Sequence, residues 1–182
     1  MVGARMDKLT LPNALSASRL LLAPLCFTAV THERWIVAAA LLFLAITTDV
    51  IDGRLARRRG LVTSFGGLLD HGSDAFFVTL TLAALAVVGL VPWLLPLLVA
   101  AAFAQYVLDS RALAGQPLRA SRLGRYNGIA YFVLAGAPVV HAALGLELLP
   151  AGLFYALGWV LVATTITSMA DRVIALFRRT SR

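Results

Sequence analysis

DVIDGRLARRRGLVTSFGGLLDHGSD, residues 49–74, holds four aspartates within a chain that is otherwise strongly apolar. Asp49 and Asp52 are three residues apart, and Asp70 and Asp74 are four residues apart. A carboxylate at bilayer depth costs about 2.5–3.5 kcal/mol on insertion scales, so an acid within a membrane segment marks a functional site. Because four of them lie within 26 residues, this stretch is the first candidate for a functional site in the chain.

The composition of the whole chain is that of an integral membrane protein. Of its 182 residues, 60% are hydrophobic and only 14% are charged, and the mean hydropathy is +0.85. Soluble proteins have about 45–50% apolar and about 25% charged residues. The formal net charge of +7 is typical of some nucleic-acid-binding proteins, but the basic residues alternate with apolar spans and form no continuous stripe. We therefore expect membrane lipids, and no nucleic acid, as partners.

Six segments are apolar and long enough to cross a bilayer as helices, which takes about 20 residues. They are residues 12–30, 35–52, 61–89, 92–109, 124–145 and 150–177. The breaks between them carry turn or helix-start residues, as in the break from Gly53 to Gly60. The sequence predicts an all-α membrane protein with six transmembrane helices in a single domain, residues 1–182.

The basic residues predict how this protein is oriented, because short cytoplasmic loops are enriched in Lys and Arg. With six spans and both termini on one side, thirteen basic residues share that side and only Arg34 lies on the other. The thirteen are Arg5, Lys8, Arg54, Arg57, Arg58, Arg59, Arg111, Arg119, Arg122, Arg125, Arg178, Arg179 and Arg182. We expect both termini and the aspartates to face the cytoplasm of a bacterial or archaeal cell. Arg172, Arg178 and Arg179 are interpreted as a basic tail on the membrane surface.

Helix geometry brings the four aspartates to one place. Residues three or four apart lie on one face of an α-helix, about 60° and about 40° apart around its axis. The pair that ends the second span and the pair in the third can therefore point into one shared space. Four neighbouring carboxylates repel one another unless a cation neutralises them, and their hard oxygens favour Mg²⁺, Mn²⁺ or Ca²⁺ over zinc. This pattern predicts a metal site.

Small and basic residues accompany the aspartates. Gly53, Ala56 and Gly66 carry little side-chain bulk, so that a ligand or a neighbouring helix can approach the backbone closely. Arg57 supplies a planar, permanently charged fork that suits phosphate oxygens. Carboxylates, a metal and an arginine together indicate a site for a phosphoanhydride at a membrane surface.

This pattern resembles the signature of the CDP-alcohol phosphatidyltransferases. The matching residues are Asp49, Asp52, Gly53, Ala56 and Arg57, then Gly66 after eight residues, Asp70 after three more and Asp74 after another three. The resemblance implies a Mg²⁺-dependent enzyme, with Mn²⁺ as a substitute, that moves the phosphatidyl group from CDP-diacylglycerol to the hydroxyl of a polar alcohol and releases CMP. It also implies a homodimer.

The same resemblance implies a role for each of these residues. Asp49, Asp52 and Asp70 would ligate the metal, and Asp74 would act as the general base and as a further ligand. The CDP moiety would be bound by Gly53, Ala56, Arg57 and Gly66. A general base suits the last aspartate, because a carboxylate bound to a metal is a weak base.

The acceptor alcohol is indicated by other parts of the chain. Residues 11–16, LPNALS, followed by Arg19 and Pro24, resemble the first segment of phosphatidylglycerophosphate synthases and cardiolipin synthases. The chain departs from that branch at His71, where proline is usual, and at 126–127, where Tyr-Asn replaces Lys-Thr. We expect His71, about 100° from Asp70 around the helix, to point off the shared face.

A phosphorylated acceptor needs cationic contacts beyond those used for the CDP diphosphate. Glycerol 3-phosphate is the acceptor we expect, with Arg111 and Arg125 as its phosphate contacts. Phosphatidylglycerol, as in a cardiolipin synthase, inositol phosphate and serine remain alternatives. A cation transporter is an alternative of another class, in which the carboxylates form an ion path. Ion sites of transporters are typical of the membrane midplane, whereas these aspartates lie toward one side of the membrane.

Overall fold

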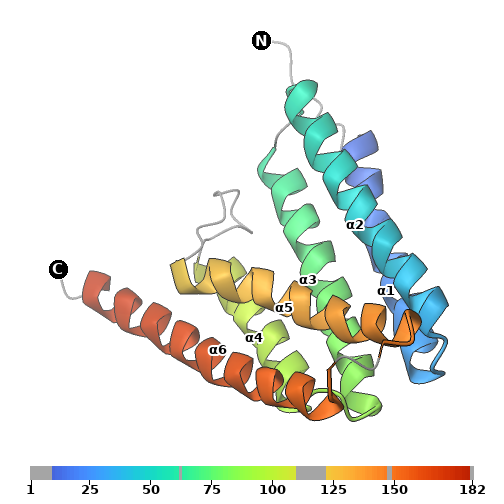
Figure 1. Cartoon of the computed structure of the whole chain (residues 1–182). Coiled ribbons are helices and arrows are strands. Elements are labelled where there is room, and N and C mark those ends of the chain that lie inside the picture. The colour runs from blue at the N-terminus through green and yellow to red at the C-terminus, as the bar shows by residue number, and fades with distance from the viewer. Residues whose placement is uncertain (1–9, 62, 110–121, 147–148, 181–182) are drawn as a thin grey trace.

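The fold consists entirely of helices in the part of the chain that the structure describes, which comprises residues 10–61, 63–109, 122–146 and 149–180. The structure is a computed structural model. Its helices are α1 Leu11–Thr31, α2 Trp35–Arg58, α3 Ser64–Val87, α4 Leu94–Asp109, α5 Arg122–Ala143 and α6 Ala151–Thr180 (Figure 1). The predicted all-α architecture with six helices is confirmed. Most of the break expected at 110–123 lies outside the described residues.

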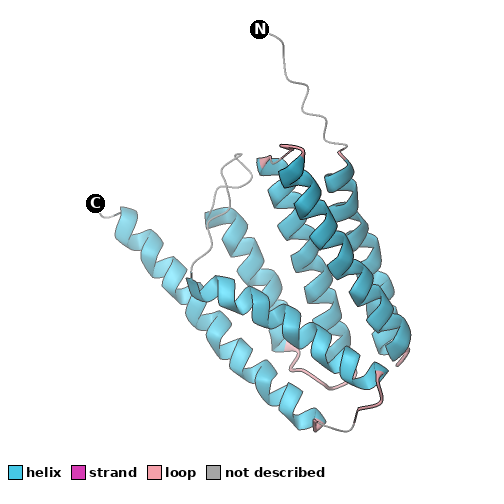
Figure 2. Cartoon of the chain, turned by 45° about the horizontal axis from the view of Figure 1, so that its top comes forward, coloured by secondary structure: helices cyan, strands magenta, loops and turns pink. Residues whose placement is uncertain are grey.

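The first three helices form one compact half of the molecule. They lie side by side with their axes roughly aligned in both views (Figures 1 and 2). Helix α1 packs against both α2 and α3. The other helices cover this unit from one side, with α4 against α3, α5 against α2 and α3, and α6 against α4 and α5. In Figure 1, α5 and α6 cross the direction of α3 at a wide angle. The two halves therefore diverge toward the end where α2 finishes and α3 begins.

Local signals set the ends of the helices near the aspartates. The Thr10 side chain accepts from the backbone N–H of Asn13 and begins α1, and Thr63 caps α3 in the same way by accepting from Gly66 at 3.0 Å. Gly60 follows α2 with φ +63°, a conformation that favours glycine. The break predicted from Gly53 to Gly60 is too long, because α2 continues to Arg58.

The core is built from small and medium apolar side chains, and the outer surface is also apolar. Ala23, Cys26 and Leu82 are completely buried where α1 meets α3. On the outside, Leu21, Ile36 and Phe43 are each more than 70% exposed. Apolar side chains on both sides of a helix are typical of a membrane span. By length and composition, α1, α2 and α6 up to Ala175 can each cross a bilayer, and α4 is a shorter apolar helix.

The contact between α6 and the turn before α4 provides a test of this packing. A Cβ atom added to Gly158 would lie 2.4 Å from Cδ of Pro92, whereas one added to Gly152 would meet nothing within 4 Å. We predict that Gly158→Ala lowers the stability by about 1–3 kcal/mol through overpacking. Thermal unfolding of the purified protein in detergent measures this, with Gly152→Ala as the matched control. Equal melting temperatures for the two variants would contradict the packing of α6 on Pro92.

Candidate functional site

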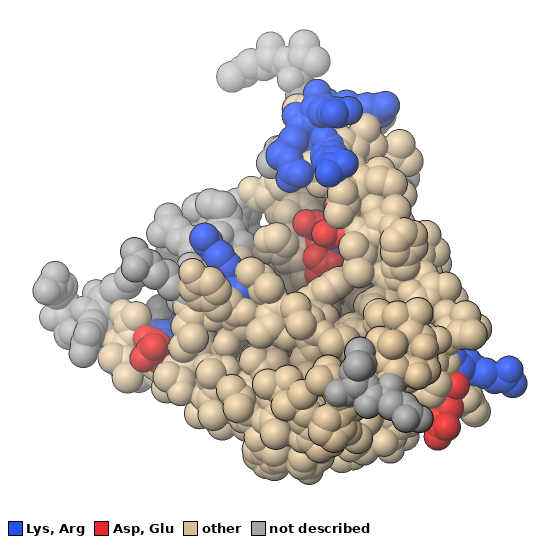
Figure 3. All heavy atoms as spheres, viewed as in Figure 1, with Lys and Arg blue, Asp and Glu red and all other residues tan. Residues whose placement is uncertain are grey.

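The four aspartates meet where α2 and α3 face each other. Their carboxylates lie in a hollow beneath the basic side chains at the end of α2 (Figure 3). Oxygens of Asp49, Asp52 and Asp70 lie within 4.8 Å of one another, and Asp70 forms a second such group with Asp74 and His71. The structure thus brings together all four carboxylates that the spacing predicts to converge.

Arg19 of α1 lies at the centre of this group. Its Nη1 donates to Asp49 Oδ1 at 2.6 Å and to Asp74 Oδ1 at 2.5 Å. Its Nη2 donates to Asp52 Oδ2 at 2.9 Å and to Asp70 Oδ1 at 2.5 Å. The arginine side chain is only 1% exposed. One buried guanidinium therefore partners carboxylates of two helices from a third helix.

Sequence reasoning missed this role, although the signal was present. Arg19 is the only charged residue between Leu11 and Thr31, and a charge inside an apolar span marks a functional site just as the aspartates do. In the sequence, Arg19 was interpreted only as one of the residues that resemble the first segment of phosphatidylglycerophosphate and cardiolipin synthases. Its partners could not be read from spacing, since they lie 30 to 55 residues away in the sequence.

The four carboxylates differ in their exposure. Asp52 is the innermost, with its side chain 3% exposed, and its Oδ2 also accepts from Ser16 Oγ at 2.9 Å. The side chains of Asp49, Asp70 and Asp74 are 44%, 28% and 31% exposed. The cluster is therefore closed on the side of α1 and open toward the hollow.

The small residues of the signature leave space for specific neighbours. A Cβ on Gly53 would lie 3.3 Å from Nη1 of Arg57, so that the absence of a side chain lets this guanidinium lie against the helix. A Cβ on Gly66 would lie 3.1 Å from Oδ1 of Asn13. Arg57 is exposed, and Ala56 is half-buried. Gly53, Ala56 and Arg57 follow Asp52 within about one and a half turns of α2, and Gly66 precedes Asp70 by about one turn of α3.

A cavity of about 610 Å³ adjoins the cluster between α3, α4, α5 and α6. Asp74 and His71 line it from α3, and Arg125 lines it from α5. Arg172 of α6 lies in the same wall, with its guanidinium 5.1 Å from the ring centre of Tyr106. The interpretation of Arg172 as part of a surface tail is therefore wrong. Arg111 lies outside the described residues.

His71 also lies closer to the site than its position on the helix predicted. Its Nδ1 is 3.6 Å from Asp70 Oδ2, and the imidazole lines the cavity. The angular argument considered only the face that α3 turns toward α2, whereas the cavity lies on the neighbouring face. His71 thus lines the cavity beside the cluster, a position that the expectation about the shared face did not address.

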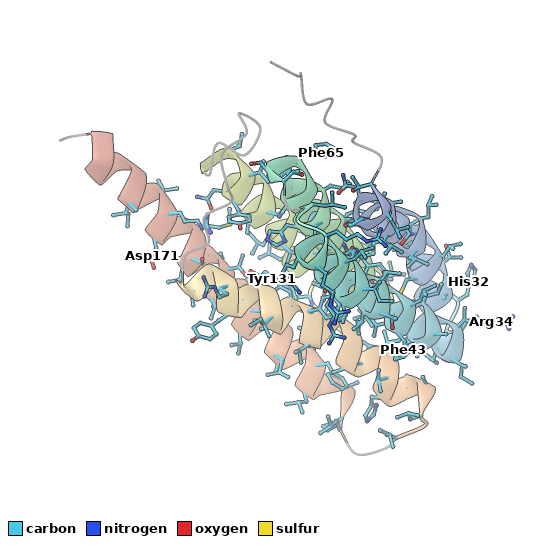
Figure 4. The ribbon with its side chains drawn as sticks, turned by 90° about the horizontal axis from the view of Figure 1, so that it is seen from above. His32, Arg34, Phe43, Phe65, Tyr131 and Asp171 are labelled. Carbon is cyan, nitrogen blue, oxygen red and sulfur yellow. The ribbon has the colours of Figure 1, made fainter. Side chains whose placement is uncertain are left out.

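The interior of the cavity is largely apolar, with a few fixed polar groups. The hydroxyls of Tyr131 and Thr165 lie 2.5 Å apart. Figure 4 shows Tyr131 among the helices, whereas Arg34 lies at the outer edge of the molecule. Gln105 donates to the backbone oxygen of Met169 at 3.1 Å. The ionisable side chains Asp74, His71, Arg125 and Arg172 lie in the cavity wall together with these neutral polar groups.

The carboxylates suit the divalent cation that the family resemblance implies. Arg19 takes one oxygen from each of them, so that each keeps a second oxygen. No described residue donates a hydrogen bond to the second oxygen of Asp49, Asp52 or Asp74. Several anionic oxygens within a few ångströms form a donor set that fits Mg²⁺ or Mn²⁺.

Comparison with known proteins gives a consistent family. The sequence profile of the CDP-alcohol phosphatidyltransferases matches residues 9–170. A CDP-diacylglycerol–glycerol-3-phosphate 3-phosphatidyltransferase of Bacillus subtilis is 34% identical over 108 residues, which cover 58% of this chain and 56% of that protein. A cardiolipin synthase (CMP-forming) of Streptomyces coelicolor is 37% identical over 103 residues, 50% of this chain and 46% of that protein.

A plant protein is similar as well. The chloroplastic/mitochondrial CDP-diacylglycerol–glycerol-3-phosphate 3-phosphatidyltransferase 1 of Arabidopsis thaliana is 36% identical over 97 residues, 48% of this chain and 33% of that protein. The chain thus spans about half the length, or less, of these curated relatives.

Removal of single carboxylates tests the metal site. We predict that Asp49→Asn and Asp70→Asn each weaken Mn²⁺ binding by roughly tenfold or more, because loss even of a ligand's outer partner costs about 10–100-fold. Electron paramagnetic resonance of Mn²⁺ titrated into purified protein measures the affinity. Asp171→Asn, an exposed acid on α6, is the control and should bind as the unchanged protein does. Equal affinity in all the variants would exclude a metal site at the cluster.

Proposed function

This chain belongs to the CDP-alcohol phosphatidyltransferase family, and we propose that it transfers the phosphatidyl group of CDP-diacylglycerol to the hydroxyl of a polar alcohol, with release of CMP. Glycerol 3-phosphate is the acceptor we propose, in keeping with the names of the Bacillus and Arabidopsis relatives. The name of the Streptomyces relative makes phosphatidylglycerol the first alternative. Inositol phosphate and serine remain further alternatives.

The position of Asp74 is the observation that carries this proposal. Its carboxylate belongs to the acidic cluster, where it accepts from Arg19, and it also lines the cavity between α3 and α6. A general base for phosphatidyl transfer must lie within hydrogen-bond reach of the acceptor hydroxyl while the oxygen of that hydroxyl approaches the phosphorus of the donor. As the acceptor oxygen attacks, Asp74 takes its proton, and the bond from phosphorus to the CMP oxygen breaks.

The donor lies on the open side of the cluster in this proposal. Gly53, Ala56 and Gly66 give the CDP moiety access to the backbone of α2 and α3, and Arg57 contacts its phosphates. In this proposal Asp49, Asp52 and Asp70, together with Asp74, hold Mg²⁺ or Mn²⁺. When bound, the cation supplies charge neutralisation at the diphosphate.

The acceptor enters the cavity from the side of Arg125 and Arg172. Both arginines line its wall, so a phosphate on the acceptor can contact a guanidinium while its hydroxyl lies near Asp74. His71 lies next to this path. Arg111 remains an expected additional contact.

We further propose a single-domain homodimer, with all six helices crossing the membrane and both termini in the cytoplasm of a bacterial or archaeal cell. The basic residues counted above support this orientation, because it puts nearly all of them on one side. The cluster lies toward the end of α2 and the start of α3, which would put it near the cytoplasmic surface.

An assay of CMP release tests the proposed reaction. Purified full-length protein in detergent with Mg²⁺ and CDP-diacylglycerol is offered glycerol 3-phosphate, phosphatidylglycerol, inositol phosphate or serine in turn. We expect CMP to form fastest with glycerol 3-phosphate. Release with none of the four would contradict phosphatidyl transfer to this class of alcohols, and cation flux into vesicles without any CDP-lipid would favour a transporter.

The acceptor site makes a separate prediction. Arg125→Gln and Arg172→Gln should each raise the KM for glycerol 3-phosphate by roughly tenfold and leave binding of the CDP donor nearly unchanged, because a charged hydrogen bond contributes about 1.5–3 kcal/mol. Arg58→Gln removes an exposed charge at the end of α2 and serves as the control. Steady-state kinetics with each substrate varied in turn measures both constants. An unchanged acceptor KM in both cavity variants would show that these arginines only contact lipid headgroups.

A further inference from the structure

All five N–H groups of the buried Arg19 guanidinium have an acceptor. Its two Nη atoms carry four N–H groups, and these meet one oxygen from each of the four aspartates. The fifth, on Nε, faces the backbone oxygen of Ser16 in the same helix at 3.5 Å. A planar guanidinium is the only side chain with five donors, whereas the ammonium of lysine has three. Its shape and not only its charge therefore matches this cluster.

Because of the orientation of these contacts, the two oxygens of each carboxylate have different surroundings. One oxygen of each aspartate points to Arg19, on the side of α1. Three of the four side chains remain 28–44% exposed, so their other oxygens are accessible from the hollow. At these three carboxylates, a guanidinium on the inner side and a cation on the outer side can thus bind without competing for an oxygen.

The surroundings of Arg19 also keep its side chain in the cluster. It is 1% exposed and lies in the middle of a helix that packs against both α2 and α3. Leaving the cluster would bury an unpaired guanidinium among apolar side chains, and it would leave Asp52, 3% exposed, with Ser16 as its described partner. Breaking a buried ion pair on one side is strongly destabilising.

We propose that Arg19 is a positioning residue that stays in place when the divalent cation binds. It holds the inner oxygen of each carboxylate, and in this way it turns the outer oxygens toward one cation site. The inference rests on the metal-binding part of the proposed function and not on the identity of the acceptor. Arg19 also reduces the formal charge of the cluster from −4 to −3, so that a divalent cation meets less mutual repulsion among its ligands.

The variant Arg19→Lys separates shape from charge. Lysine keeps the positive charge but cannot hold four carboxylates with three donors. We expect the variant to bind Mn²⁺ roughly 10–100-fold more weakly, as when the outer partner of a metal ligand is lost, and to unfold at a lower temperature. Electron paramagnetic resonance of Mn²⁺ without any lipid substrate reads the affinity. Arg34→Lys, at the far edge of the molecule, is the matched control and should leave both quantities unchanged.

Two results would overturn the proposal. Mn²⁺ binding by Arg19→Lys equal to that of the unchanged protein would mean that charge alone suffices. Tighter binding in Arg19→Gln would mean that the guanidinium competes with the cation for the same oxygens. If Arg19→Lys does not fold, the double variant Arg19→Gln, Asp52→Asn keeps the formal charge at −3 and carries the same test. Mn²⁺ binding weaker than in the single variant Asp52→Asn supports positioning by Arg19, and binding as tight as in that single variant contradicts it.

Because no acceptor or CDP-lipid is present in these titrations, their outcome is independent of phosphatidyl transfer. A protein that releases no CMP with any alcohol can still show the expected loss of Mn²⁺ affinity. Conversely, an active enzyme in which Arg19→Lys binds Mn²⁺ normally would retain the proposed function and lose this inference.

Discussion

The contact of one buried guanidinium with four carboxylates is the interaction on which the rest of this structure depends. Arg19 comes from α1, and its partners come from α2 and α3, so the contact ties together the three helices that form one half of the molecule. Burying such charges is costly unless every one of them is partnered. The relative positions of these three helices are therefore restricted around the acidic cluster.

The second half of the molecule, α4 to α6, provides most of the wall of the cavity beside the acidic cluster. Helices α4, α5 and α6 diverge from α3 and enclose the cavity that Asp74 lines. One carboxylate thereby faces both the acidic cluster and the cavity, and in the proposed reaction this gives the donor and the acceptor separate approaches to one place. Close alignment of two reactants is among the largest contributions that a protein makes to a transfer reaction.

Much of this architecture could be predicted from the sequence, because it depends on local patterns. Apolar segments gave the helices, and spacings of three and four residues gave the convergence of Asp49 with Asp52 and of Asp70 with Asp74. What could not be predicted depends on packing between distant segments. The partners of Arg19, the place of Arg172 in the cavity wall and the approach of His71 to it follow from how the helices cross. Spacing along one helix carries no information about these crossings.

The most direct test of the central claim is an experimental structure of the full chain with Mn²⁺, in which anomalous scattering locates the metal. We expect the Mn²⁺ peak on the hollow side of the cluster, in contact with oxygens of Asp49 and Asp70. The guanidinium of Arg19 should still contact all four carboxylates from the side of α1. A peak at the present position of the guanidinium, with Arg19 turned away, would contradict a cluster shared by the two cations.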